Sequence, residues 1–477
     1  MNIVWIKRDL RLQDHRPLFE AELSGEEYII VYLFEPSIIS YKDTSIRHLQ
    51  FIYKSLKVMN DGLKNYNRSV CIYEKEALDT FKDLISKHTI NTVYSYQESG
   101  IGITYERDKK LKSLFNRNHI KWCEYQRDGI VRGITNRKGW DKKWFATMKE
   151  KQIHNKYSKL SGSLKNHNYL SKSLINKLED YSTEFQSPGE IEAHRLLKSF
   201  AEIRGKNYSK YISKPAESRI SCGRISPYLA WGNISVKQAY QYIKNHPNYN
   251  TNKRSFNGIL TRLKWRDHFI QKFEIEWQIE TRCANKGFET LRRRSDSDHI
   301  KAWMEGRTGV PMVDANMRCL IKTGWINFRM RAMLVSFLCH HLDCDWRFGV
   351  YHMAQLFLDY EPGIHYSQFQ MQAGTTGINA IRIYNPVKQG LDHDPSGDFI
   401  KKWIPELKSF KSEYVHEPSK VPPLLMNLEM PDKNYPNPIV DVSLAANKAR
   451  KKIWAHRKLE SVKRENLRIL STHTRNS

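Results

Sequence analysis

The sequence has few cysteines and no long apolar run, and both absences exclude whole classes of protein. No stretch approaches the roughly 18 uninterrupted apolar residues that a membrane span requires, and the N-terminus has no apolar signal segment. The seven cysteines form no CxxC pair, and no second ligand pair follows Cys339, His340, His341 and Cys344 at zinc spacing. We therefore expect a cytoplasmic protein with reduced thiols, no membrane association and no metal.

Three common catalytic motifs are also missing. The chain contains no GxxxxGK[ST], no HExxH and no GxSxG. The usual phosphate-loop, zinc-hydrolase and serine-hydrolase interpretations therefore have no support in the sequence.

Acidic residues are scarce relative to basic ones. The chain has 51 Asp+Glu against 78 Lys+Arg, which gives a formal net charge of +27. A charge of this sign and size favours a nucleic-acid partner. The alternative is that an AT-rich genome has raised the lysine and asparagine content throughout, because the lysines are spread over both halves of the chain.

The N-terminal part alternates between apolar runs of strand length and stretches with helical periodicity. The runs are residues 3–6, 28–34, 70–73, 92–96 and 122–125. Helical spacing between them is clear at Leu49, Ile52, Tyr53, Leu56, Met59 and Leu63, and again from Thr104 to Phe115. This alternation predicts repeated βαβ units and a doubly wound parallel sheet in an α/β domain of residues 1–130.

The rest of the chain divides by composition into three parts. Residues 131–190 lose periodicity and are rich in Lys, Ser, Asn and Tyr, which predicts a linker. Residues 191–458 have helical spacing almost throughout and predict an all-α domain. Residues 459–477 are basic without a clear apolar face, which predicts a frayed helix or a disordered tail.

The most informative motifs lie in the second half. Four blocks follow one another there, WMEGRTGVPMVDANMRCLIKTGW (303–325), DWRFGV (345–350), RIYNPVKQG (382–390) and DPSGDFIKKWIPEL (394–407). Three more lie upstream, WIKRDLRLQDHRPL (5–18), SRISCGRISPYLAWGNIS (218–235) and LKWRDHF (263–269). Together they resemble the photolyase and cryptochrome family of blue-light flavoproteins, from Met1 to about Lys458. The resemblance implies that the helical domain binds FAD.

The resemblance also assigns cofactor-binding positions. Arg331 and Asp359 match an ion pair beside the flavin ring, and Glu361 stands where the family usually has a second aspartate. The segment before Pro227 can bind phosphate, because a helix N-terminus favours an anion. The full set of expected FAD-binding residues is Tyr208, Tyr211, Cys222, Gly223, Arg224, Ile225, Ser226, Arg262, Trp265, Arg266, Phe269, Phe328, Arg331, Asp359, Glu361 and His365.

Several positions depart from the family pattern. Cys222 and Gly223 replace a usual Thr-Ser pair, with Ser221 as a substitute one place earlier. His365 occupies the place of a common asparagine near the reactive flavin nitrogen, where it is expected to donate a proton or tune the redox state, or simply to cap the loop.

The family's light-driven reduction uses three tryptophans that lead from the flavin to the surface. Trp346 and Trp303 match the middle and outer members, but Phe369 occupies the innermost place and is too hard to oxidise. Tyr366, Tyr384 and Trp325 are alternative relays, unless these aromatic residues only build the core. The expected catalytic residues are Trp303, Trp346 and His365.

The function implied by the resemblance is FAD-dependent, blue-light-driven repair of UV-damaged DNA by a monomeric deoxyribodipyrimidine photo-lyase. Expected DNA contacts are Arg266, Arg329, Met371 and Arg382. Arg262 replaces a glutamate usual in pyrimidine-dimer photolyases, so the lesion, a cyclobutane dimer or a (6-4) product, stays open. The alternative function is a cryptochrome-type photoreceptor without repair.

The resemblance also implies a second, antenna chromophore in the N-terminal domain. Glu106 lies near the position where a folate-binding glutamate is expected. The identity of this pigment stays open.

Overall fold

The computed structural model describes residues 1–161, 168–422 and 434–474. The chain forms two compact units, each assembled from segments that are not contiguous in sequence. Unit 1 comprises Met1–Ile203, Gly223–Glu280 and Leu358–Gly363. Unit 2 comprises Arg204–Cys222, Thr281–Phe357 and Ile364–Ser477.

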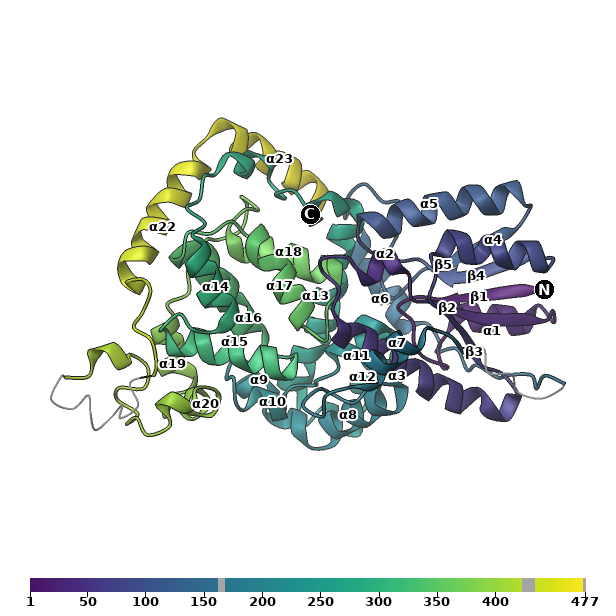
Figure 1. The fold of residues 1–477 in the computed structure, drawn as a ribbon, viewed down its shortest axis with the longest axis horizontal. Helices are drawn as coiled ribbons and strands as arrows, with labels where there is room; N and C mark the ends of the chain where they lie inside the picture. Colours follow the sequence, from purple (N-terminus) through teal and green to yellow (C-terminus); the bar gives the residue numbers. More distant parts are fainter. Residues whose placement is uncertain (162–167, 423–433, 475–477) are drawn as a thin grey trace. The chain divides into compact units, whose positions relative to one another are not determined.

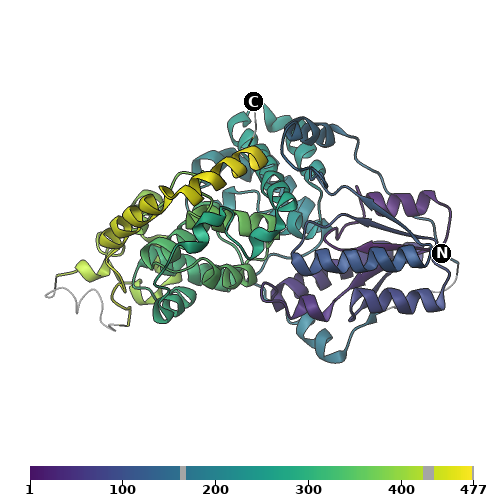
Figure 2. The same cartoon turned by 90° about the horizontal axis from the view of Figure 1, so that it is seen from above.

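Unit 1 contains a parallel sheet of six strands (Figures 1 and 2). The strands are β1 (Asn2–Ile6), β2 (Tyr28–Leu33), β3 (Val70–Tyr73), β4 (Thr92–Tyr96), β5 (Lys121–Tyr125) and β6 (Asn168–Tyr169). Their order is β5-β4-β1-β2-β3-β6, so the chain builds outward from β1 in one direction and then returns to add β4 and β5 on its other side. The carboxyl ends of β1 and β4 therefore form a topological switch point, where open α/β sheets place their ligands.

Helices cover the sheet because its strands are apolar on both faces. On one face Ile3, Trp5, Val31 and Val93 pack against Phe81 and Leu84 of α4 (Ala77–Lys87) and Leu111 and Phe115 of α5 (Gly102–Arg117). The opposite row, which includes Val4 and Ile30, is also buried. Burial on both faces is typical of a doubly wound parallel sheet, and the predicted fold class is confirmed.

The other helices of unit 1 come from three parts of the chain. The N-terminal part contributes α1 (Arg16–Leu23), α2 (Pro36–Ile39) and α3 (Ile46–Leu63). Later parts contribute α6 (Trp140–Lys149), α7 (Lys172–Glu179), α8 (Glu190–Glu202), α11 (Ser226–Trp231), α12 (Val236–Asn245) and α13 (Lys253–Ile275). The helical spacing noted from Leu49 to Leu63 corresponds to the buried face of α3.

Unit 2 is helical over the residues that the structure describes, as predicted. Its main helices are α9 (Tyr208–Tyr211), α10 (Ser218–Ser221), α14 (Ser297–Glu305), α15 (Pro311–Thr323), α16 (Phe328–Ser336), α17 (Arg347–Leu356), α18 (Pro362–Ala373, whose first two residues belong to unit 1), α19 (Pro386–His393), α20 (Asp398–Trp403), α22 (Val442–Arg457) and α23 (Glu460–His473). None of the helices in the described ranges is both long enough and apolar enough to cross a bilayer.

The structure corrects two of the predicted segments. The predicted linker, 131–190, contains α6, β6 and α7, and Trp140 and Trp144 of α6 are buried. The predicted tail, 459–477, contains α23, which buries Val462 and Ile469. Residues 162–167 and 475–477 of these two segments lie outside the described residues. Charged and polar residues outnumber the apolar ones in both segments and concealed the apolar face, which is formed by only a few widely spaced residues.

Candidate functional site

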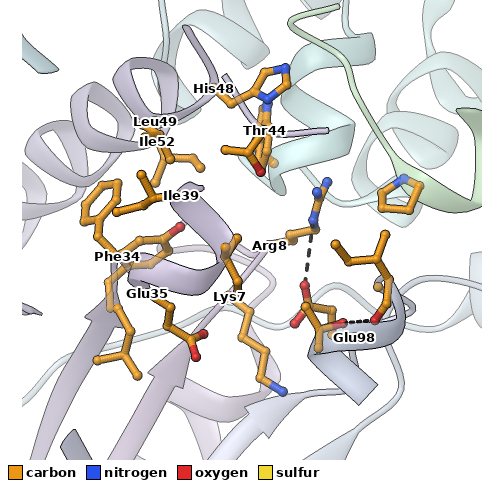
Figure 3. Close-up of a pocket in the computed structure, with 18 of the residues that line it drawn as sticks. Lys7, Arg8, Phe34, Glu35, Ile39, Thr44, His48, Leu49, Ile52 and Glu98 are labelled. Atoms are coloured by element: carbon orange, nitrogen blue, oxygen red, sulfur yellow. Dashed lines mark hydrogen bonds and ion pairs between the residues drawn. The ribbon is translucent and has the colours of Figure 1, made fainter. Parts of the chain in front are cut away.

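A pocket lies at the carboxyl ends of β1, β2 and β4 in unit 1 (Figure 3). It encloses about 780 Å³, part of which is open to solvent. Lys7 and Arg8 follow β1, Phe34 and Glu35 follow β2, and Glu98 follows β4. The pocket therefore occupies the switch point that the strand order defines, and we call it the strand-end pocket.

The charged side chains of the strand-end pocket are paired with one another. Arg107 contacts Glu35 and Glu98, each at 2.7 Å, and the Arg8 Nε lies 3.8 Å from the Glu98 carboxylate. Burial alone would raise the pKa of Glu98, but the charges of Arg107, Lys7 and Arg8 outweigh it and lower this pKa to about 2. At Glu35 burial prevails, and its pKa is raised.

One wall of the strand-end pocket is aromatic. The Arg8 guanidinium lies 4.3 Å from the centre of the Trp231 ring, and His48 stacks on Tyr360 with ring centres 5.7 Å apart. Tyr360 belongs to the segment Leu358–Gly363, which also carries Asp359 and Glu361. The wall of the pocket therefore includes part of the segment for which flavin contacts were predicted.

Glu361 lies in a buried network of charges within unit 1. Its Oε2 accepts from Arg127 at 3.0 Å and from Arg266 at 3.4 Å. Arg266 also contacts Asp128 at 3.2 Å and Asp267 at 2.7 Å. Burial raises the pKa of Asp267 to about 6 despite the charge of Arg266. The Arg266 guanidinium is thus surrounded by carboxylates and is unavailable to a DNA phosphate.

The predicted phosphate segment is divided between the units. Cys222 ends the unit 2 part, and its carbonyl accepts from Arg204 at 2.6 Å. In unit 1, the Arg224 guanidinium donates to Gln186 at 2.7 and 3.1 Å, and Ser226 begins α11 with Pro227 in its first turn. Ile225 is buried, as is Gly223. Tyr208 is buried and Tyr211 is partly exposed, both on α9 in unit 2.

Helix α13 in unit 1 presents several predicted residues on one face. Arg262 and Trp265 are exposed, and Trp265 keeps 47% of its surface accessible. Phe269, one turn further, is buried, and its ring centre lies 5.7 Å from that of Trp265. An accessible indole supported by a second aromatic ring can stack on a planar ligand.

Unit 2 contains the remaining predicted flavin contacts. The His365 Nε2 lies 2.8 Å from the Val350 carbonyl oxygen, which can only accept, so this nitrogen carries the proton. The Arg331 Nε donates to Ile326 O at 3.0 Å, and its guanidinium lies 3.9 Å from the Phe357 ring centre. Asp359 belongs to unit 1, so its pairing with Arg331 stays a prediction.

The predicted DNA contacts of unit 2 differ in accessibility. Arg382 is exposed. Arg329 is partly exposed and donates to Gln389 at 3.2 Å. Met371 is 8% exposed. Arg382 is therefore the most accessible of these three side chains, and Met371 the least. Phe328, which was predicted as an FAD contact, keeps 42% of its surface accessible.

The predicted outer relay residue is not at a surface. Trp303 is fully buried and its indole N–H donates to Leu334 O at 3.1 Å, while Trp346 is 1% exposed. A terminal relay residue must reach solvent to regain an electron, so Trp303 does not fit the role of outer member. Phe369 is also buried.

Sequence reasoning missed Arg127, Trp231 and Tyr360. Arg127 lies two residues after the end of β5, and a charged residue near a strand end was the one signal that could have indicated it. The sequence around Tyr360 gave no such signal, because an aromatic residue between two acids is equally typical of a surface loop. Glu106, expected near the antenna, is exposed, pairs with Lys109 and lies outside the pocket lining.

The residues present fit FAD. Two buried polar atoms at predicted positions, Ser221 Oγ and Glu361 Oε1, have no hydrogen-bond partner within the described residues. Buried polar atoms are normally satisfied, so the Ser221 hydroxyl can donate or accept a bond with a polar group of FAD, and the Glu361 carboxylate can accept one. Glu361 belongs to the α/β unit and Ser221 to the helical unit. An α/β unit with a strand-end pocket and a helical unit, each with one such group, are typical of a two-domain flavoprotein.

Comparison with known proteins specifies the family. A family model described as DNA photolyase matches residues 2–156, and one described as the FAD binding domain of DNA photolyase matches residues 259–455. The chain belongs to the photolyase and cryptochrome family and carries its FAD-binding domain.

Proteins named photo-lyase and proteins named cryptochrome are both similar to this chain over most of their length. A deoxyribodipyrimidine photo-lyase of Alkalihalophilus pseudofirmus is 27% identical, covering 94% of this chain and 97% of that protein. A cryptochrome DASH of Danio rerio is also 27% identical, covering 87% and 85%. The structure of a Sulfolobus tokodaii photolyase with two FAD molecules has a TM-score of 0.77 at 26% identity, covering 95% of this chain and 100% of that one.

Proposed function

We propose that this protein is a DNA photolyase, which uses FAD and blue light to reverse pyrimidine photoproducts in UV-damaged DNA. The observation that carries the proposal is that photolyase family models match both residues 2–156 and residues 259–455. Curated relatives named deoxyribodipyrimidine photo-lyase extend the similarity to 94% of the chain. The net charge of +27 adds attraction for any nucleic acid.

When bound, FAD supplies light-driven electron donation to the photoproduct and takes the electron back after the lesion splits. The protein's own residues bind FAD and set the hydrogen bonds and charges at the polar edge of the flavin ring. Arg331 and Asp359 would bind this edge, with Glu361 Oε1 beside them. Ser221 Oγ and the amides of Gly223 to Ser226 would bind the pyrophosphate. His365, protonated on Nε2, would offer Nδ1 as an acceptor in its neutral form.

The DNA contacts in this proposal are fewer than the sequence implies. Trp265 would stack on the flipped lesion, because its indole is accessible and supported by Phe269. Arg329 and Arg382 would contact the phosphates, and Met371 would contribute only a small apolar edge. Arg266 is left out, because its guanidinium is committed to Glu361, Asp128 and Asp267.

The test is repair of defined oligonucleotides. Protein with chemically reduced FAD is illuminated with separate substrates that contain one cyclobutane dimer or one (6-4) product, and intact DNA is quantified by chromatography. Repair of either lesion supports the proposal and assigns the lesion type. Dark reactions and a Trp265→Ala variant are the controls. Absence of repair of both lesions, with FAD shown to be reduced, contradicts it.

The alternative function is a cryptochrome-type photoreceptor. Arg262, exposed one turn before Trp265, favours it, because this position in dimer photolyases usually carries glutamate. Relatives named cryptochrome DASH also match most of the chain. In that case illumination would change the FAD spectrum reversibly while both lesions persisted.

A second chromophore in the strand-end pocket is also part of the proposal. The pocket lies at the switch point of the sheet, and the Sulfolobus tokodaii photolyase is described as holding two FAD molecules. Extraction of the purified protein under denaturing conditions, followed by mass spectrometry, identifies any pigment besides FAD.

A monomeric state and a cytoplasmic location complete the proposal. The seven free cysteines fit a reducing compartment.

A further inference from the structure

The segment Leu358–Gly363 is held in unit 1 by side chains that come from the sheet and its first loops. Before Asp359, the Trp231 indole N–H donates to Leu358 O at 2.8 Å. After it, Arg8 donates to Tyr360 O at 3.0 Å. The main chain is therefore bound on both sides of Asp359, which restricts rotation of the peptide groups around it.

The Tyr360 side chain is fixed as firmly as its main chain. Its hydroxyl donates to the Asp43 carboxylate, and its ring stacks on His48 at 16° between planes. Burial raises the pKa of Asp43, although the bond from Tyr360 opposes that shift. Tyr360 is 3% exposed and Asp43 is 2% exposed, so water does not compete for this bond.

Arg8 joins these contacts into one cluster. Its guanidinium lies 4.3 Å from the Trp231 ring centre and 5.8 Å from that of Tyr360, and its charge is balanced by Glu98 at 3.8 Å. A planar guanidinium can stack on rings and donate to a carbonyl at the same time, which lysine cannot do. Figure 3 shows Arg8 pointing into the strand-end pocket beside Glu98.

We propose that Arg8 and Asp43 are positioning residues of the flavin site, which act through Tyr360 to set the place of Asp359. This inference rests on the proposed contact between Asp359 and FAD. Neither Arg8 nor Asp43 needs to touch FAD, because the main chain of residues 358–361 carries the effect. The α/β unit thereby contributes to FAD affinity from residues more than 300 positions earlier in the chain, since Arg8 and Tyr360 are separated by 352.

The first experiment measures FAD affinity in single variants, by fluorescence quenching of FAD added to the apoprotein. Arg8→Met and Tyr360→Phe are each expected to weaken binding by about tenfold, the effect of about one lost hydrogen bond to an anchored group. Arg8→Lys should recover part of the loss, because lysine can still donate to Tyr360 O.

Matched controls exist in the same unit. Tyr105→Phe removes a tyrosine that donates to Glu274 at 2.7 Å, and Arg68→Met removes a guanidinium 4.2 Å from the Tyr28 ring centre. The partners of both side chains lie elsewhere in unit 1, with Tyr105 bonded to Glu274 and Arg68 to Ser158. Both controls should leave FAD affinity within about twofold while losing comparable thermal stability. Equal loss of FAD affinity in controls and test variants would overturn the inference.

The deciding experiment is a double-mutant cycle between Arg8→Met and Asp359→Asn. If Arg8 acts through Asp359, the double variant binds FAD no more weakly than Asp359→Asn alone, within about twofold. Additive losses overturn the inference. If Asp359→Asn itself leaves affinity unchanged, the proposed Asp359 contact fails instead. Visible circular dichroism of FAD-saturated Tyr360→Phe is a second measurement. Loss of stability alone does not alter the spectrum of bound flavin, so a changed spectrum supports a displaced Asp359 and an unchanged spectrum contradicts it.

Discussion

Glu361→Gln tests whether this glutamate stabilises unit 1 as part of the buried charge network. Glutamine keeps an oxygen that can accept from Arg127 and Arg266, so the variant removes the charge with little change in shape. Those donors lie 3.0 and 3.4 Å from Glu361 Oε2, and Glu361 is 1% exposed. Hydrogen bonds between charged groups contribute about 1.5–3 kcal/mol, and breaking a buried pair costs about 3–5 kcal/mol.

Because glutamine retains the hydrogen bonds, the expected loss lies below the cost of a fully broken buried pair. We expect the free energy of unfolding to fall by about 2–3 kcal/mol. For a unit of this size each kcal/mol shifts Tm by about 2–4 °C, so the Tm should fall by roughly 4–12 °C.

The assay is thermal unfolding of the apoprotein followed by circular dichroism, which removes any contribution from bound FAD. The control is Glu106→Gln, which breaks the exposed pair with Lys109 and should shift Tm by less than about 1 °C. An unchanged Tm in Glu361→Gln would refute the reasoning, because it would mean that two buried guanidinium groups do not need this carboxylate.

Three further outcomes are expected. Glu98→Gln should lower the free energy of unfolding by about 3 kcal/mol at neutral pH, because the pKa of Glu98 is lowered from 4.5 to about 2. The difference in stability from the wild type should shrink as pH falls below about 4.5, as measured by urea unfolding across pH. Ser221→Ala should weaken FAD binding about threefold or more without lowering the Tm of the apoprotein, since the buried Ser221 hydroxyl has no partner within the described residues. An unchanged affinity for FAD would contradict this. Arg329→Ala should weaken binding to damaged and undamaged DNA alike and reduce the salt slope by about 1, measured by fluorescence anisotropy; loss confined to damaged DNA would contradict it.

The sheet could be predicted from the sequence because its strands are buried on both faces. Runs such as Tyr28–Leu33 and Val70–Tyr73 are therefore continuously apolar and coincide with strands. Helix α6 could not, because its buried residues are only Trp140, Trp144 and Met148, and the sequence around them is rich in lysine and resembles a linker. Periodicity reports an apolar stripe only when enough residues form it.

The candidate site was harder to predict than the fold. Motif resemblance found Glu361 and Arg266, but it could not show that Glu361 pairs with both Arg266 and Arg127. The role of a charged residue depends on where its side chain points and on how deeply it is buried. Both depend on contacts between residues distant in sequence. Trp303 illustrates the same limit, since an expected surface residue is fully buried.

The discontinuous make-up of unit 1 has a consequence for the biosynthesis of this protein. Arg8 leaves the ribosome 352 residues before Tyr360, its partner in the folded chain. At about 5–20 residues per second, this delay lasts roughly 20–70 s. Throughout that interval Arg8 lacks the pocket wall that Tyr360 completes, and Asp43 and Trp231 lack it from the time each is synthesised, so the nascent α/β unit exposes an incomplete strand-end pocket to chaperones. Truncation before residue 358 would leave that state permanent, and fragments ending there should aggregate even though the whole sheet is present.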